Sequence, residues 1–222
     1  MIKCFRGCPK PGRVGHPGRR RKRMRVIGIS GGVGSGKSSV LNYIEENYDA
    51  RVVQADEVGY LLMLPGGDCY QEVIELFGEW IVMEDGTLDR MKIAEIVFQK
   101  REMLDRLDGI IHPAVKEYIK REVARARKED VSYFFIEAAL LIEEKYDEIY
   151  DELWVVYCEP QVRRERLRND RGYTDQRIDE ILANQLSDDE YEAAADFVLY
   201  NSEDVEHTHL QIDRRMRKYE TM

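Results

Sequence analysis

This 222-residue sequence has no long apolar run and no organised cysteine pattern. A transmembrane helix needs ~18–20 consecutive apolar residues, and no stretch approaches that length, so we expect no membrane-spanning segment. The four cysteines form no CxxC pair and show no His-rich spacing of the kind that binds metals. Such cysteine usage fits a reducing, cytoplasmic environment.

Acidic residues are absent from the first 24 positions, which hold nine of the 34 Lys and Arg residues and include the run RRRKR. This region also lacks the apolar segment of a secretory signal. Its Gly, Pro and Arg content is typical of disorder. We interpret residues 1–23 as a basic, disordered leader outside the functional domain, with Met24 as an alternative start. The RRRKR run could instead bind nucleic acid or an anionic surface.

The rest of the sequence is strongly acidic, with 25 basic and 43 acidic residues and hence a net charge of −18. An acidic body is a poor general binder of nucleic acid, so we expect no specific nucleic-acid partner. The hydrophobic fraction of 43% is sufficient for a buried core. The length suits one large α/β domain, or a core with a small inserted subdomain. The oligomeric state does not follow from these data.

Short apolar runs alternate with longer amphipathic stretches such as KSSVLNYIEENY. Five strands are predicted, in RVIGIS (25–30), RVVQAD (51–56), the start of YFFIEAALL (133–141), LWVVYC (153–158) and FVLYN (197–201). Continuously apolar strands that alternate with helices predict a parallel sheet covered on both faces. The expected fold is a three-layer α/β/α arrangement around a five-stranded parallel sheet.

Two spans of the expected domain, residues 24–222, depart from this alternation. Residues 57–130, approximately, show helical patterns without a clear strand, so we interpret them as a helical insertion between the second and third strands. Residues 160–192, approximately, are charged, helical and broken at Arg171-Gly172. That pattern is typical of a mobile helical lid over a site.

A glycine-rich stretch, Gly31-x-x-x-x-Gly36-Lys37-Ser38, matches the P-loop pattern GxxxxGK[ST] between a predicted strand and a predicted helix. Glycines let the backbone turn tightly with its amides pointing inward, and the following helix N-terminus attracts anions. Lys37 adds a positive charge between the β- and γ-phosphates, Ser38 offers a hydroxyl to Mg²⁺, and Ser39 can reach the α-phosphate. The loop is therefore predicted to bind a nucleoside triphosphate.

A P-loop alone does not distinguish a kinase from a GTPase or a motor ATPase. The sequence lacks the NKxD-type motif that reads guanine, which argues against a GTPase. The small chain, with an apolar strand that ends in Glu137, favours a small-molecule kinase. A kinase for a nucleoside, nucleotide or sugar remains an alternative. So does a nucleotide-dependent module that uses the basic leader to bind nucleic acid.

Three charged residues follow predicted strands or break the predicted lid. Ligands of open parallel sheets bind at the carboxyl ends of strands. Asp56 is expected to end the second strand beside the P-loop strand, where it could deprotonate the acceptor hydroxyl; alternatively it caps the next helix. Glu137 could bind the Mg²⁺ shell through water, or act as a structural cap. Arg171 could neutralise the transferring phosphoryl group, whereas most arginines around it are expected to be solvated.

The sequence resembles the dephospho-CoA kinase family from Met24 to about Asn201. The similar blocks are GGVGSGKSS (31–39), QADEV (54–58), DGTLDR (85–90), IIHP (110–113), EAALLIE (137–143), RGYT (171–174) with Gln185, and ADFVLYN (195–201). The sequence departs from the family pattern at Gln54, where the family usually has Asp, and at Ala139, where it usually has Pro. The leader has no counterpart in that pattern.

The resemblance implies ATP-dependent phosphorylation of the ribose 3′-hydroxyl of dephospho-CoA, giving CoA and ADP. It implies that the helical insertion holds dephospho-CoA, that Asp56 is the base and that Arg171 closes over the phosphoryl group. ATP and Mg²⁺ would bind at Gly34, Ser35, Gly36, Lys37, Ser38 and Ser39.

Three further residues take roles from the same resemblance. Arg90 and His112 would belong to the substrate region, and Asn201 would lie near the adenine. His112 could instead be a structural histidine. Because His112 precedes Pro113, its backbone is expected to be extended.

Overall fold

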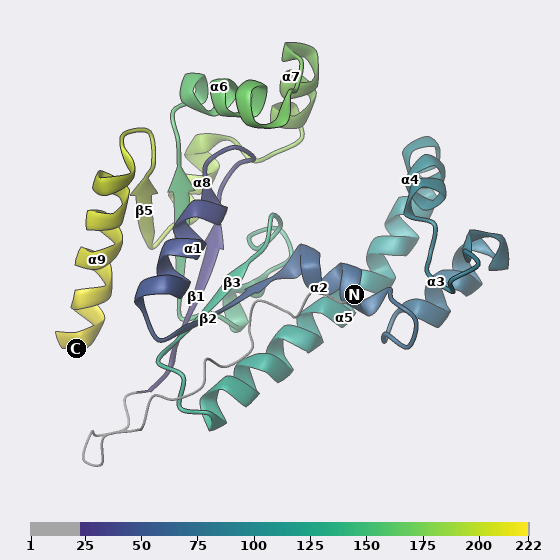
Figure 1. The fold of residues 1–222 in the computed structure, drawn as a ribbon, viewed down its shortest axis with the longest axis horizontal. Helices are drawn as coiled ribbons and strands as arrows, with labels where there is room; N and C mark the ends of the chain where they lie inside the picture. The colour runs from purple at the N-terminus through teal and green to yellow at the C-terminus, as the bar shows by residue number, and fades with distance from the viewer. Residues whose placement is uncertain (1–22, 222) are drawn as a thin grey trace. The chain divides into compact units, whose positions relative to one another are not determined.

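A computed structural model describes residues 23–221, and Figure 1 shows their fold. The strands are β1 (Arg25–Ser30), β2 (Ala50–Gln54), β3 (Tyr133–Glu137), β4 (Glu152–Tyr157) and β5 (Phe197–Tyr200). They form one sheet in the order β2-β3-β1-β4-β5, in which β1 pairs in parallel with β3 and β4, and β4 pairs in parallel with β5. The predicted five-stranded parallel α/β fold is confirmed. Apart from Arg23, the predicted leader lies outside the described residues.

The second strand differs from its prediction in both position and length. β2 is an edge strand, and β3 lies between it and β1. The expectation that the second strand adjoins the P-loop strand is therefore wrong. β2 ends at Gln54, and Asp56 lies in the first turn of α2 (Ala55–Leu62) instead of ending the strand. As a result, Glu137, at the end of β3, belongs to the strand that adjoins β1.

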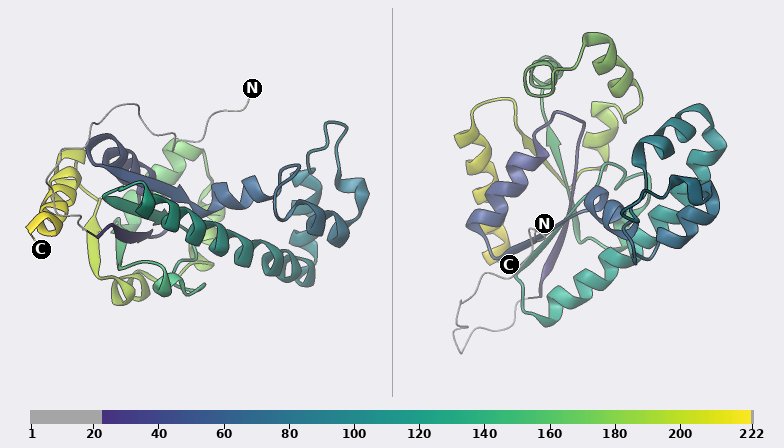
Figure 2. Two further views of the ribbon diagram at one scale, coloured as in Figure 1. Left: turned by 90° about the horizontal axis from the view of Figure 1, so that it is seen from below. Right: turned by 45° about the vertical axis from the view of Figure 1, so that its right-hand side comes forward.

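The chain forms two compact units, the first comprising residues up to Val52 and from Ala126 onward, the second Val53–Arg125. The helices of the first unit are α1 (Lys37–Asn47), the short η2 (Tyr146–Glu148), α6 (Pro160–Arg171), α7 (Asp175–Ala183), α8 (Asp188–Ala194) and α9 (Val205–Thr221). α1 packs against α9, while α6 and α7 lie beyond the carboxyl ends of the strands (Figures 1 and 2). Open parallel sheets bind ligands at the carboxyl ends of their strands, and here those ends lie next to α6 and α7.

Both faces of the sheet are buried, because alternate side chains along each strand point to opposite faces. Ile27, Ile29 and Trp154 belong to a core cluster shared with α1 and α9. Val26 and Val155, which neighbour these residues along the strands and therefore point to the opposite face, are also inaccessible to solvent. Burial on both sides explains why the strands are continuously apolar instead of alternating with polar residues.

The second unit is helical and contains α2, α3 (Tyr70–Phe77), the short η1 (Glu79–Ile81), α4 (Arg90–Gln99) and most of α5 (Arg101–Lys128). Each helix buries an apolar side, represented by Val58 in α2, Val73 in α3 and Ile93 in α4. Among the described helices of both units, not one combines the length and the apolar character that crossing a bilayer requires.

α5 runs without interruption through Pro113, so His112 is helical and the expected extended backbone at this position is wrong. A proline inside a helix costs about 3 kcal/mol. Val115, Ile119 and Val123 recur on one side of α5 and are buried. Burial of each such side chain contributes about 1.5–3 kcal/mol, so tertiary packing outweighs the local preference at Pro113.

Candidate active site

The P-loop connects β1 to α1 and depends on glycine for its conformation. Gly31, Gly34 and Gly36 have φ values of 138°, 84° and 94°, which residues other than glycine rarely adopt. Gly36 is also the N-cap of α1, so the loop leads directly into the amide-rich end of that helix. This arrangement presents backbone N–H donors and the positive end of a helix dipole to an anion.

Lys37 and Glu137 lie together beside this loop. Lys37 Nζ donates a hydrogen bond to the Gly31 carbonyl at 2.6 Å and lies 3.9 Å from Glu137 Oε1. The two side chains are only 14% and 12% exposed. The prediction treated these residues separately, and their pairing follows from the position of β3 next to β1. An ammonium and a carboxylate are thus held at the entrance to the loop.

Two arginines of α6 also contact the P-loop, although most arginines of this stretch were expected to be solvated. Arg163 is buried and donates to Asp188 at 3.2 Å. Its guanidinium packs so closely on Gly32 that a Cβ there would lie 2.4 Å from Arg163 Nη1. Arg166 Nη1 lies 3.4 Å from the Ser35 carbonyl oxygen. Arg163 and Arg166 are therefore exceptions to the expectation that most arginines of this stretch are solvated.

A spacing signal could have identified these arginines. Arg163, Arg166 and Leu167 recur at intervals of three and four, so they share one side of α6. Leu167 is almost completely buried, which marks that side as the inward one. Arg166 also donates to Cys158 Sγ at 3.4 Å. Burial raises the pKa of the Cys158 thiol, and the neighbouring Arg166 partly opposes that increase.

The segment between α7 and α8 reaches the P-loop through Gln185. Its Oε1 atom accepts a hydrogen bond from the Val33 backbone N–H at 3.1 Å. Together with Arg163, this contact links the predicted lid region to the phosphate-binding loop.

Arg171 is the last residue of α6 and is exposed, and Gly172 ends the helix in the left-handed conformation with φ 65°. Thr174 then caps α7. The helix break therefore lies at the predicted position. Within residues 23–221, the structure shows no ion pair for Arg171, whereas Arg168 on the preceding turn pairs with Asp175. The guanidinium of Arg171 is therefore available to an anionic ligand.

Asn201 follows β5 directly and is buried. Its amide Nδ2 donates to the Ser35 carbonyl at 2.7 Å. The structure therefore places Asn201 against the P-loop.

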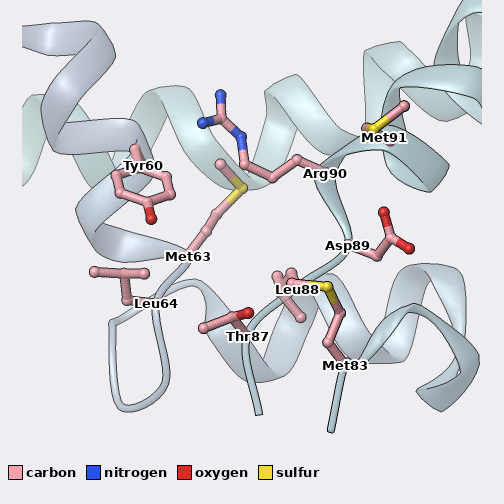
Figure 3. A pocket seen from close by; sticks show the side chains of 9 residues that line it. All are labelled: Tyr60, Met63, Leu64, Met83, Thr87, Leu88, Asp89, Arg90 and Met91. Carbon is pink, nitrogen blue, oxygen red and sulfur yellow. The ribbon is translucent and has the colours of Figure 1, made fainter. Parts of the chain in front are cut away.

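In the second unit, Arg90 and Tyr60 line a pocket of about 300 Å³ (Figure 3). Arg90 is the first residue of α4, and its guanidinium carbon lies 4.9 Å from the centre of the Tyr60 ring, a cation–π arrangement. The other residues lining the pocket are mostly apolar: Met63, Leu64, Met83, Thr87, Leu88, Asp89 and Met91. The pocket therefore combines a cation with an apolar, methionine-rich surface.

The two remaining predicted residues of this unit do not line the pocket. Asp56 is exposed in the first turn of α2. His112 lies on α5, with Nε2 3.6 Å from Asp108 Oδ1. Across residues 23–221, no cluster of three or more His, Cys, Asp or Glu side chains is arranged to hold a metal ion.

The sequence profile of the family described as dephospho-CoA kinase matches residues 25–207. This chain belongs to the dephospho-CoA kinase family. It is an ATP-dependent transferase that acts at the final step of coenzyme A biosynthesis, as the resemblance of its motifs predicted.

Individual relatives match along most of their length. The dephospho-CoA kinase of Carboxydothermus hydrogenoformans is 35% identical over 199 residues, which cover 88% of this chain and 95% of the relative. The dephospho-CoA kinase of Geobacter sulfurreducens is 35% identical over 181 residues, covering 81% of this chain and 90% of the relative.

Solved structures share the fold of this chain. A crystal structure of a Thermus thermophilus protein superposes with a TM-score of 0.74 at 25% identity, covering 89% of this chain and 98% of that one. The dephospho-CoA kinase from Campylobacter jejuni gives a TM-score of 0.66 at 18% identity, covering 87% and 96%, and shows the shared fold.

Proposed function

We propose that this chain transfers the γ-phosphoryl group of ATP to the ribose 3′-hydroxyl of dephospho-CoA, giving CoA and ADP. The observation that carries the proposal is the P-loop of a dephospho-CoA kinase family member, with Lys37 at its entrance. Backbone amides and an ammonium in this arrangement complement a triphosphate, because negative charge develops on the oxygens between and around the β- and γ-phosphorus atoms.

Asp56 is the proposed general base. As the ribose oxygen attacks the γ-phosphorus, its proton passes to the Asp56 carboxylate, and the bond to the bridging oxygen breaks to leave ADP. Asp56 is solvent-exposed, so its carboxylate is accessible to a substrate hydroxyl. Arg171 would neutralise the transferring group, and its exposure on a helix end leaves its guanidinium free to approach one.

Ser38 and Glu137 are the residues that would hold Mg²⁺. Both present oxygen atoms, which Mg²⁺ prefers, and Ser38 is exposed in the first turn of α1. Two oxygen ligands are consistent with an ion that enters together with ATP, because phosphates and water usually complete its coordination. When bound, the ion would neutralise charge on the β- and γ-phosphates. Before ATP binds, Lys37 counters the charge of the Glu137 carboxylate. When ATP binds, the Lys37 ammonium would move toward the phosphates.

The pocket of the second unit is proposed to receive part of dephospho-CoA. Its apolar lining suits the uncharged arm of that substrate, and the Arg90 guanidinium suits a phosphate. His112 is proposed to belong to the same substrate region by family resemblance, although it does not line this pocket.

Replacement of Arg90 by Met is expected to raise KM for dephospho-CoA by about tenfold, the value of one charge-assisted contact, with KM for ATP unchanged. Steady-state kinetics with each substrate varied in turn would measure both constants. Arg101→Met is a suitable control, since Arg101 is exposed on α5 and pairs with Asp105. An equal rise in both KM values, or an equal effect of the control, would remove Arg90 from the substrate site.

Phosphate transfer from labelled ATP to a panel of acceptors tests the reaction itself. We expect Mg²⁺-dependent turnover with dephospho-CoA, abolished by EDTA and restored by added Mg²⁺. Adenosine, AMP and gluconate should be poor acceptors. Strong turnover of one of these three, without turnover of dephospho-CoA, would overturn the proposal. A protein that lacks residues 1–23 should retain full turnover, because the proposed chemistry uses none of them.

We also propose a cytoplasmic location. Cys69 and Cys158 are both buried free thiols, which fits a reducing compartment.

A further inference from the structure

We propose that Asn201 is a positioning residue of the phosphate-binding loop and acts through the Ser35 carbonyl. The inference rests on the proposed use of this loop for the phosphates of ATP. Asn201 would orient one backbone N–H of the loop toward the phosphates instead of contacting the nucleotide with its own side chain.

The Asn201 amide is fixed at both ends. Its Nδ2 donates to the Ser35 carbonyl at 2.7 Å, and its Oδ1 accepts from Thr208 Oγ1 at 2.9 Å. The Ser35 carbonyl can only accept a hydrogen bond, so the end of the amide that faces it must be the NH₂ group, and Oδ1 then faces the Thr208 hydroxyl. Asn201 and Thr208 are 8% and 4% exposed. Both hydrogen bonds are therefore shielded from competing water.

The backbone of Asn201 is held equally firmly. Its N–H donates to the Tyr157 carbonyl at 2.8 Å, which continues the pairing of β4 with β5 by one residue. Thr208 lies in the first turn of α9, where its backbone N–H donates to the carbonyl of Asp204, the residue before the helix. The sheet and α9 therefore together fix the position of an amide that reaches into the P-loop.

Anchoring the Ser35 carbonyl also determines the direction of the next amide. In a trans peptide the C=O of one residue and the N–H of the following residue point in opposite directions. The Ser35–Gly36 bond is trans, like every other described peptide bond. Because Ser35 C=O points at Asn201, the Gly36 N–H points away from it. Within residues 23–221, no acceptor is found for this N–H, which leaves it available to an anion.

The contact also constrains Gly36 itself. A Cβ on Gly36 would lie 2.1 Å from Asn201 Nδ2, so the approach of the amide requires glycine independently of the φ value of 94°. Arg166 supplies a second, longer contact to the same carbonyl at 3.4 Å. Loss of the Asn201 donor would leave the carbonyl with this weaker partner alone, and the peptide would be free to rotate.

Two measurements, the affinity for each ligand and the melting temperature of the free protein, distinguish a positioning role from the alternatives. A residue that orients a phosphate-binding amide should affect ADP, GDP and inorganic pyrophosphate to similar extents. A residue that contacts adenine should affect ADP alone. A residue that only stabilises the fold should lower the melting temperature of the free protein without changing its affinity for any of these ligands.

The experiment uses Thr208→Val, which has nearly the same shape without the hydroxyl, and Thr208→Ser, which keeps it. Asn201→Asp keeps the shape of the side chain and removes the donor to Ser35. Calorimetric titration with ADP, GDP and pyrophosphate should show affinities weakened about tenfold in Asn201→Asp and about threefold to tenfold in Thr208→Val, in line with one lost hydrogen bond. Thr208→Ser should bind within about twofold of the parent, and KM for dephospho-CoA should not change.

Unchanged affinities in Thr208→Val, accompanied by a lower melting temperature, would overturn the proposal in favour of a structural role. Weaker binding of ADP alone would overturn it in favour of an adenine contact. Thr208→Val keeps the test decisive if the buried carboxylate of Asn201→Asp prevents folding. Nucleotide binding needs no acceptor, so failure to phosphorylate dephospho-CoA would refute the proposed function without deciding this inference.

Discussion

Replacing Asp56 by Asn is expected to lower kcat for dephospho-CoA by about 10²–10⁴-fold, the usual contribution of a general base. The amide keeps the size of the side chain but cannot accept the ribose proton. Since Asp56 is exposed and the change removes no core contact, the unfolding free energy should change by less than about 0.5 kcal/mol. Steady-state kinetics combined with urea unfolding would measure both quantities.

Glu57 offers a matched control. It is the next residue along α2, lies in the same first turn, and is likewise exposed. Glu57→Gln removes the same charge from the same helix end, so any effect of Asp56→Asn on the helix dipole should be reproduced by it. If both variants lose activity equally, the loss comes from local charge, and Asp56 is not the base.

Replacing Arg171 by Gln should lower kcat by about 10³-fold or more, the lower range for an arginine that neutralises a transferring phosphoryl group. Arg171 lies at the C-terminal end of α6, where a cation stabilises a helix by about 0.3–1 kcal/mol. The loss of stability should not exceed that range. Kinetics and thermal unfolding on the same preparations would compare the two effects.

Arg177→Gln is the control for this substitution. Arg177 is exposed on α7 and pairs with Glu180, so it lies in the same predicted lid without a proposed role. Its removal should leave kcat within about twofold of the parent, as expected for an exposed surface pair. Comparable losses of activity and stability in Arg171→Gln would show that the residue maintains α6 instead of acting in the transition state.

Local sequence determined the elements that depend on few neighbours. The apolar run from Arg25 to Ser30 forms β1 as predicted, and the P-loop follows it because glycine alone readily supports positive φ values at Gly31, Gly34 and Gly36. The end of α6 at Gly172 was equally predictable, since a left-handed glycine commonly ends a helix.

Long-range packing determined the features that could not be predicted from the sequence. The order of strands is not encoded in any one strand, so the placement of β3 between β2 and β1, and with it the pairing of Lys37 with Glu137, could not be read from local pattern. The helical path through Pro113 likewise depends on the burial of distant side chains along α5.

The sequence by itself therefore determined the parallel α/β class, the phosphate-binding loop and the family of this protein, because motifs and hydrophobic period are local properties. Only the tertiary structure decided which side chains surround the loop. Arg163, Arg166 and Asn201 come from segments more than 120 residues beyond it. The spacing of the two arginines places them on one side of α6, but it does not identify the loop as the partner of that side. Their contacts exist because the sheet and its covering helices bring those segments together, and a contact between distant segments is a property of the packed core rather than of either segment.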